Sequence, residues 1–245
     1  MANSWRNDLR RLSGTVAIWA LVSPAGAEWH GKASFLTDYV YRGYSLSRGN
    51  PVFQGELDYE HESGLYGGLA ISQVGFDDKE YGNRAQVQFK PYLGWTLPLA
   101  EHWRADFAAT GYIFDGPVFG RDSNFSEIYA SLNYRQWLTA RIAFAPDAYQ
   151  RGANTLDYEI QGRYDLFDNV QLSAGLGFYQ AGQLLDYEYF YWNAGVTWFV
   201  HRYVAADLRY VDMDIDSHPH PGEPANHFNP RPLQNKVLFS ISVGF

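Results

Sequence analysis

The sequence ends with "LFSISVGF", residues 238–245, in which two kinds of side chain alternate. Phe239, Ile241, Val243 and Phe245 are apolar, and the residues between them are small or polar. Successive side chains of a β-strand point to opposite faces, so this pattern predicts a strand with one apolar and one polar face. Because chain ends are usually polar and loosely held, a terminal strand of this kind indicates a sheet that pairs its last strand.

The same alternation recurs in about twelve segments between residue 33 and the C-terminus. In "LDYEIQGRY" (156–164), for example, Asp157, Glu159 and Arg163 lie between apolar or aromatic residues. The segment 65–76 alternates poorly, and the sequence does not assign its faces. A soluble β-sandwich and a membrane barrel both produce such strands, so alternation by itself does not choose between them.

The connections between these segments favour a membrane barrel. They alternate in length, which is typical of outer-membrane barrels with short periplasmic turns and longer external loops. The short ones are 61–64, 98–102, 135–137, 165–169 and 200–203, and the long ones are 43–51, 77–84, 115–124, 145–154, 180–186 and 212–232. Trp95, Trp103, Trp137 and Trp198 lie next to short turns, where an interfacial aromatic girdle is expected. We therefore predict an all-β, antiparallel, up-and-down transmembrane barrel of about twelve strands, in which the last strand pairs with the first.

The first 27 residues have the organisation of a cleavable export signal. Arg6, Arg10 and Arg11 precede a short apolar core, residues 12–22, and "SPAGA" (23–27) ends in a small-x-small cleavage site. An amphipathic helix of the mature protein remains the alternative. Removing residues 1–27 would take away three Arg and one Asp, leaving 16 basic and 26 acidic residues and a net charge of −10. We expect a signal peptide over 1–27 and one barrel domain over 28–245.

The composition excludes several classes of protein. The chain has no Cys, so it has no disulfide framework and no cysteine-based metal site or nucleophile. A pI of about 5.3 is unfavourable for binding nucleic acid. After the signal, no stretch approaches the roughly 20 apolar residues of a membrane helix. The mean hydropathy of −0.35 does not exclude a membrane barrel, because only alternate residues of its strands meet lipid.

One part of the sequence resembles a known family. "TDYVYRGYS" (37–45), Pro51, "QGELDYEHESGLYGG" (54–68) and "SQV" (72–74) are similar to the opening of the TorF-family porins. The family pattern has Phe, Gln and Asn at the positions of Tyr41, Leu46 and Gln73, and the strong match covers about 40 residues. The resemblance implies an outer-membrane barrel with a channel role. It carries over no substrate and no functional residue.

If the apolar faces meet lipid, the charged residues of the opposite faces line the lumen. These pore candidates are Asp38, Arg42, Glu56, Asp58, Lys90, Arg104, Asp106, Glu127, Arg135, Arg141, Asp157, Glu159, Arg163, Asp207, Arg209 and Lys236. With Glu60 they amount to nine acids and eight bases, a near balance. The excess negative charge must then lie in loops, particularly 212–223, which predicts weak cation selectivity.

Asp38 and Arg42 occupy one face of the predicted strand "ASFLTDYVYR" (33–42), four residues apart. Such a charged pair in the lumen has two interpretations. It could form a constriction, or it could be an ion pair that holds the first strand in register. The second has slightly more support, because buried charges must be paired or solvated.

The last loop contains His218, His220 and His227. Three histidines could bind Zn²⁺ or Cu²⁺ if the loop folded around the ion. The prolines among them favour a solvated loop instead, so we predict no metal and no cofactor. His102 and His201 lie in short turns without a serine or carboxylate arrangement suited to hydrolysis, so we predict no enzyme activity.

Together these features predict a porin-like channel in the outer membrane of a Gram-negative cell, which passes small hydrophilic solutes by diffusion. The expected partners are membrane lipid and lipopolysaccharide, the barrel assembly machinery that reads Phe245, and the solutes, but no nucleic acid. Twelve strands lie between the smallest barrels, which side chains fill, and the sixteen-stranded porins. A structural or adhesive barrel with a plugged lumen therefore remains an alternative, and a hydrolase has weaker support.

Overall fold

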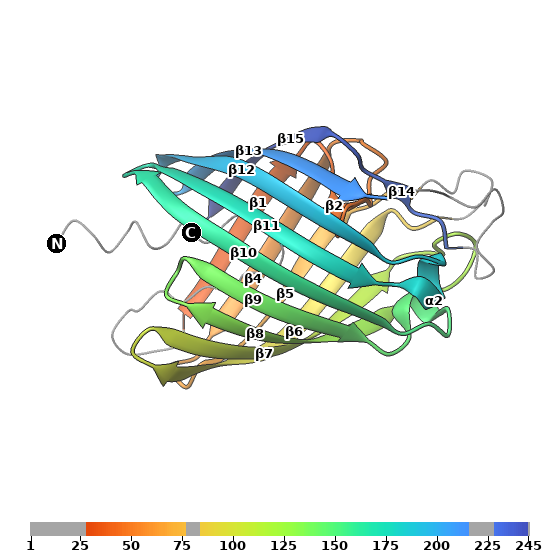
Figure 1. Cartoon of the computed structure of the whole chain (residues 1–245), viewed down its shortest axis with the longest axis horizontal. Helices are drawn as coiled ribbons and strands as arrows, with labels where there is room; N and C mark the ends of the chain where they lie inside the picture. Colours follow the sequence, from red (N-terminus) through yellow and green to blue (C-terminus); the bar gives the residue numbers. More distant parts are fainter. Residues whose placement is uncertain (1–27, 77–83, 216–227, 245) are drawn as a thin grey trace.

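The computed structural model describes residues 28–76, 84–215 and 228–244 (Figure 1). The predicted signal peptide, the three histidines of the last loop and Phe245 lie outside these residues. Twelve antiparallel strands close into a barrel, as predicted, in the order β1-β15-β13-β12-β11-β10-β9-β8-β7-β6-β5-β4. They are β1 (Glu28–Leu36), β4 (Val52–Glu60), β5 (Leu65–Gln73), β6 (Val87–Ala100), β7 (Trp103–Phe114), β8 (Phe125–Tyr134), β9 (Leu138–Ala145), β10 (Thr155–Phe167), β11 (Val170–Gln180), β12 (Tyr189–His201), β13 (Val204–Asp214) and β15 (Lys236–Gly244).

The barrel closes through its first strand, which pairs with β4 on one side and β15 on the other. Ser34 faces Ser242 across the β1–β15 pair, and their hydroxyl oxygens are 2.8 Å apart. The predicted pairing of the last strand with the first is confirmed. A closed sheet leaves no edge strand with unpaired backbone groups, and β15 is accordingly paired on both sides, with β1 and with β13.

The two ends of the barrel differ in their connections, as the sequence predicts. Turns of two to four residues join β4 to β5, β6 to β7, β8 to β9, β10 to β11 and β12 to β13, and we call this the short-turn end. The other connections meet at the opposite, long-loop end (Figure 1). They carry the 3₁₀ turn η1 (Ala148–Gln150) and the short helix α2 (Gly182–Leu185). Within the described ranges, the helical segments lack the length and hydrophobicity of a membrane-spanning helix.

The outer surface of the barrel is apolar on every side. Large side chains such as Phe53, Leu93 and Leu208 point outward from different strands and are 63%, 65% and 55% exposed. Contiguous apolar surface of this extent requires an apolar environment to cover it. The four tryptophans predicted near short turns are all exposed. Strand β5, whose faces the sequence left unassigned, follows the same rule, with Leu65, Leu69 and Ile71 outward and exposed.

The first strand differs from the prediction. The sequence predicts a strand over 33–42, but β1 spans Glu28–Leu36, and the chain then leaves the wall. Residues 37–51 form a hairpin with strands β2 (Val40–Tyr41) and β3 (Tyr44–Ser45), and β14 (Arg231–Pro232) pairs with β3 to complete a small second sheet. We call residues 37–51 the lumen hairpin. The prediction fails here because alternation continues through both strands and does not mark the point where the chain turns inward.

Candidate functional site inside the barrel

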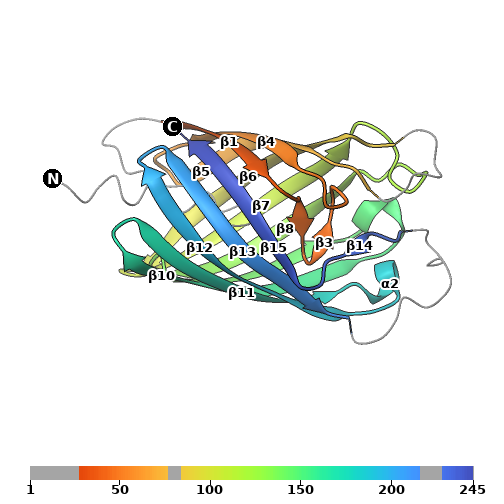
Figure 2. The same cartoon turned by 90° about the horizontal axis from the view of Figure 1, so that it is seen from above.

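The lumen hairpin crosses the interior of the barrel. Tyr39 contacts Gln88 on β6, with its hydroxyl 3.0 Å from the amide oxygen. Arg42, at the tip, reaches Glu127 on β8 and Asp157 on β10. These three strands are separated around the wall by other strands, so only a segment within the lumen can touch all of them. Figure 2 shows the hairpin continuing from the end of β1 into the interior and returning to the start of β4.

The tip is a tight turn whose two central residues, Arg42 and Gly43, have φ angles of 48° and 82°. Positive φ at both central residues matches the type I′ turn, which is suited to two-residue hairpins. The turn is fixed on two sides, because Gly43 O accepts a hydrogen bond from Leu233 N at 2.8 Å and Arg42 O accepts one from the Tyr189 hydroxyl at 2.7 Å. The backbone therefore fixes where the Arg42 side chain begins.

The Arg42 guanidinium lies between two carboxylates. Its Nη1 donates to Glu127 Oε1 at 2.7 Å, and its Nε is 3.2 Å from Asp157 Oδ2 in an ion pair without hydrogen-bond geometry. The three side chains are at most 2% exposed. The guanidinium also lies against the rings of Tyr41 and Tyr179, at 4.6 and 4.8 Å from their centroids. A guanidinium so far from water is tolerated because every face has a charged or aromatic partner.

Tyrosine hydroxyls complete the coordination of both carboxylates. Glu127 accepts hydrogen bonds from Tyr41 at 2.8 Å and from Tyr129 at 2.5 Å. Asp157 Oδ1 accepts one from Tyr191 at 2.8 Å. The Tyr191 ring lies over Gly177 of the adjacent strand, where a Cβ would come within 2.1 Å of the ring. The network thus depends on the absence of a side chain at Gly177.

Asp38 is not the partner of Arg42. Its carboxylate accepts hydrogen bonds from Ser45 Oγ at 2.5 Å, from Ser47 Oγ at 2.7 Å and from Gly49 N at 3.3 Å. The expected ion pair between Asp38 and Arg42 is therefore wrong, whereas a constriction at these residues stays a prediction. The reason is that the two residues lie on a hairpin and not on one extended strand, so Asp38 closes the base while Arg42 forms the tip.

Apolar side chains fill the rest of the interior at the long-loop end. They come from the hairpin, from inward positions of the strands and from the loops. Leu184 of α2 and Phe76 after β5 are 0% and 1% exposed. Burial raises the pKa of the Tyr149 phenol in η1 well above its ordinary value, so this group is neutral. The long-loop half of the barrel is packed like the core of a soluble domain.

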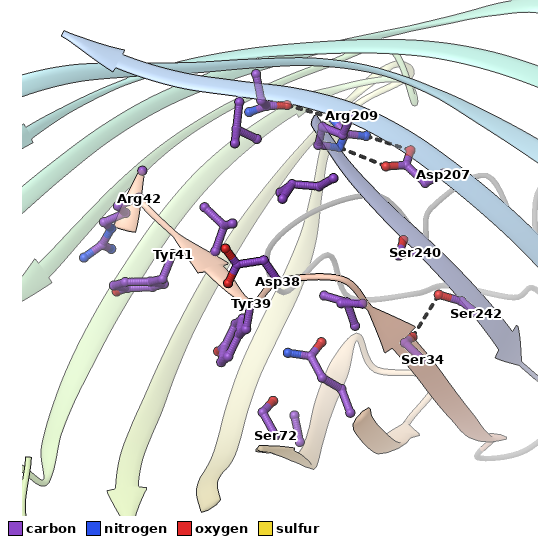
Figure 3. Close-up of a pocket in the computed structure, with 18 of the residues that line it drawn as sticks. Ser34, Asp38, Tyr39, Tyr41, Arg42, Ser72, Asp207, Arg209, Ser240 and Ser242 are labelled. Carbon is purple, nitrogen blue, oxygen red and sulfur yellow. Dashed lines mark hydrogen bonds and ion pairs between the residues drawn. The ribbon is translucent and has the colours of Figure 1, made fainter. Parts of the chain in front are cut away.

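Below the hairpin, the interior opens into a polar cavity of about 250 Å³ (Figure 3). Ion pairs line its wall, with N–O distances of 2.8 Å for Lys32–Glu56, 2.8 Å for Arg141–Glu159 and 3.0 Å for Arg209–Asp207. Lys90 also lines it and donates to the Tyr39 hydroxyl at 3.1 Å. Because its charges are mostly paired, the cavity presents a nearly neutral surface on which charged and polar groups alternate with apolar and aromatic ones.

Polar side chains continue from the cavity to the short-turn end. Arg104, Asn133, Thr139 and Arg163 point inward there and are half-buried, so water reaches them. Asp106 accepts hydrogen bonds from Tyr66 and from Thr96, the latter at 2.8 Å. This half of the interior has no counterpart of the aromatic packing around Arg42 in the described residues.

Most of the sequence-predicted pore residues lie inside the barrel, where they are buried or half-buried: Asp38, Arg42, Glu56, Asp58, Lys90, Arg104, Asp106, Glu127, Arg141, Asp157, Glu159, Arg163, Asp207 and Arg209. Their role in conduction stays a prediction. Two others lie at strand ends and are exposed. Arg135 is in the β8–β9 turn, outside the regular alternation, with Nη2 2.8 Å from His102 Nε2. Lys236 starts β15 opposite Val211, on the inward face but at the long-loop mouth.

Sequence reasoning missed the inward-facing aromatic residues that contact the hairpin. Tyr112, Tyr179, Tyr189 and Tyr191 are at most 7% exposed and belong to the apolar core of the long-loop half. A signal was present, because "GYIF" (111–114) and "EYFYW" (188–192) are aromatic or apolar on both strand faces. Loss of alternation at the long-loop end of several strands is the pattern expected when both faces meet apolar surroundings.

Comparison with solved structures identifies proteins with the same fold. The NanC porin superposes with a TM-score of 0.52 at 9% identity, covering 89% of this chain and 99% of its own. The KdgM porin gives a TM-score of 0.53 at 7% identity, covering 88% of this chain and 98% of its own. At such low identity the similarity establishes the barrel fold alone. No curated protein matches the sequence.

A family comparison covers the barrel as a whole. Residues 23–245 match the family described as "Bacterial protein of unknown function (Gcw_chp)". Membership of the TorF family remains a prediction from the motif at residues 37–74. The match includes the lumen hairpin, the carboxylates that hold Arg42 and all twelve wall strands, and the chain belongs to the Gcw_chp family.

Proposed function

We propose that this protein is an outer-membrane channel through which small hydrophilic solutes diffuse passively. The observation that carries the proposal is the polar cavity beneath the hairpin, together with the half-buried polar side chains that connect it to the short-turn end. Water in such a passage can solvate a polar solute. An apolar outer surface around a polar interior is also the arrangement of porins.

The proposed location follows from the same features. The exposed apolar band requires lipid, and the N-terminal 27 residues have the sequence pattern of an export signal. Export followed by insertion would place the short turns in the periplasm and the long loops outside the cell. Two proteins of the same fold are called porins, which supports a channel in general terms but names no solute for this chain.

A closed, structural barrel is the second candidate, and the packed long-loop half favours it. A hydrolase gains no support from the described residues. One serine–histidine contact exists, with Ser63 Oγ 2.8 Å from His61 Nδ1, but both residues belong to an exposed turn and neither lines the cavity. The choice is therefore between a channel with a restricted lumen and a structural barrel whose lumen is permanently closed.

Single-channel recording in planar bilayers distinguishes the two. The full mature protein is purified from the outer-membrane fraction, and its recovery there checks the proposed location. We expect small conductance steps, well below those of a sixteen-stranded porin, because the hairpin and its packing occupy half of the lumen. Complete absence of conductance, with the barrel shown to be folded by circular dichroism, would favour the structural barrel.

A further inference from the structure

We propose that the lumen hairpin, residues 37–51, is a gate that must leave its docking site for solutes to pass. This inference rests on the proposed channel function and deepens it. The hairpin is the part of the described chain that crosses the interior between the polar cavity and the long loops. A solute entering from the long-loop end would meet it before reaching the cavity.

The hairpin is attached differently from the wall. Each wall strand pairs with its neighbours over five or more residues, whereas β2–β3 and β3–β14 each pair over two. Little backbone hydrogen bonding would be lost if the hairpin moved, and the barrel itself would stay closed. Segments with few hydrogen-bonded neighbours open at lower free energy than the rest of a structure.

The charged contacts of Arg42 at the tip can be exchanged for water, whereas release would also have to open the ring contacts of Tyr41 and Tyr44 with the core. Arg42 is held chiefly by Glu127 and Asp157, and the Coulomb attraction of a buried ion pair is largely offset by the cost of removing its charges from water. Such a pair specifies a position without adding much net stability. The cavity beneath the hairpin is the space into which these charges would be released.

The base of the hairpin is more firmly built than its tip. Asp38 joins Ser45, Ser47 and Gly49 through hydrogen bonds that stay within the hairpin. The hairpin can therefore keep its own shape while its tip separates from β8 and β10. Arg48 and Gly49, which precede the return to β4, have φ angles of 61° and 78°, and this turn is the natural place for the backbone to change direction.

An engineered disulfide provides a direct test, because the chain has no cysteine of its own. A Cβ at Gly43 would lie 3.3 Å from Met213 Cβ on β13, close to the 3.5–4.5 Å found in disulfides. Gly43→Cys with Met213→Cys would fasten the tip to the wall. The matched control, Ala206→Cys with Ile241→Cys, joins directly opposite residues of β13 and β15 on the outer face, away from the hairpin.

Conductance is measured in planar bilayers before and after reduction, with disulfide formation checked by mass spectrometry. We expect oxidation of the Gly43/Met213 variant to lower the mean current to about a tenth or less of its reduced value, and oxidation of the control to leave it unchanged. Equal currents in the oxidised and reduced Gly43/Met213 protein would show that the hairpin is not a gate. That result would not contradict the proposed channel function. An equal loss in the control would also overturn the gate, because cross-linking of the barrel alone would then explain the effect.

A second variant tests the gate if the Gly43→Cys variant folds poorly. Gly43 has a φ angle that residues with a side chain rarely adopt. Arg42→Met leaves Glu127 and Asp157 without their cation and should favour the released state. We expect a severalfold higher open fraction, while Arg42→Lys, which keeps the charge, stays closer to the unaltered protein. Unchanged gating in Arg42→Met would contradict the inference. If the unaltered protein, the reduced variants and Arg42→Met all show no conductance, the proposed channel function itself is wrong.

Discussion

The two halves of this barrel share their strands but have opposite interiors. At the long-loop end, Phe76, Leu184 and the tyrosines around Arg42 are packed out of contact with water. At the short-turn end, inward residues such as Arg104 and Thr139 are half-buried and polar. The number of strands is the same along the whole barrel, so strand number alone does not decide whether a lumen is open. Whether the lumen is open depends on which side chains the loops place inside the wall.

The largest effect that would test this comparison comes from removing an aromatic ring in each half. Phe76, at the long-loop end, contacts Phe114 and Phe119, whereas Phe199, near the short turns, forms a small cluster with Ala205. We expect Phe76→Ala to lower the free energy of unfolding by about 3–5 kcal/mol, the usual cost of a buried phenylalanine. Phe199→Ala should cost less than about half of that.

Urea unfolding of the refolded protein, followed by tryptophan fluorescence, measures both variants. Equal losses for Phe76→Ala and Phe199→Ala would mean that the two interiors are packed alike, and the distinction between the halves would fail.

A second, smaller effect separates the outer surface from the two interiors. Leu208 and Ile160 point outward in the middle of their strands, and replacing either by Arg should cost about 2–4 kcal/mol in a bilayer near the midplane. Thr139→Arg, in the wet half, should be close to neutral. Gln161→Arg should fall between these, because Gln161 is only 8% exposed and overpacking costs about 1–3 kcal/mol.

These four variants are compared by unfolding in lipid vesicles. If arginine is tolerated equally at Leu208 and Thr139, either the facing assignment or the membrane location is wrong. If Gln161→Arg is as mild as Thr139→Arg, the wet region extends further toward the hairpin than the burial of Gln161 implies.

The smallest expected effect concerns charge at the long-loop mouth. Asp212 and Asp214 end β13 there, and Asp216 follows outside the described residues. Replacing all three by Asn should weaken a slight preference for cations without closing the channel. The cavity adds little preference of its own, because its charges are mostly paired.

Reversal potentials in a salt gradient measure this selectivity. It should fade as salt rises, since the Debye length is roughly 10 Å at 0.1 M. Strong anion selectivity in the unaltered protein would show that charges of the interior, and not the aspartates at the long-loop mouth, set the ion selectivity.

Much of the wall could be predicted from local sequence pattern. The alternation in segments such as 156–164 predicted outward Tyr158 and Ile160, and both are exposed. The alternating loop lengths predicted the two ends, and the apolar last strand predicted closure with β1. These features are local because the direction of a strand side chain depends only on its position along its own strand.

The interior could be predicted only in part. Residues 37–42 alternate like any wall strand, and nothing local indicates that Tyr39 and Tyr41 turn into the lumen. Arg42 was expected to pair with Asp38, four residues away, yet its partners Glu127 and Asp157 lie on β8 and β10. Nor does the sequence show how many inward charges meet water, because that depends on which side chains fill the space between opposite walls.

The wall of this protein is thus encoded in local pattern: its class, its number of strands, its closure and the face that meets an apolar environment. Each of these follows from the two-residue period of a strand and from the residues that favour turns, and both act within a few positions of the chain. The inward fold of the segment after β1, the burial of Arg42 between two distant carboxylates and the packing of half of the lumen are visible in the three-dimensional structure but not in the pattern. Those outcomes depend on contacts across the barrel, where the partners are brought together by closure of the sheet and not by proximity along the chain.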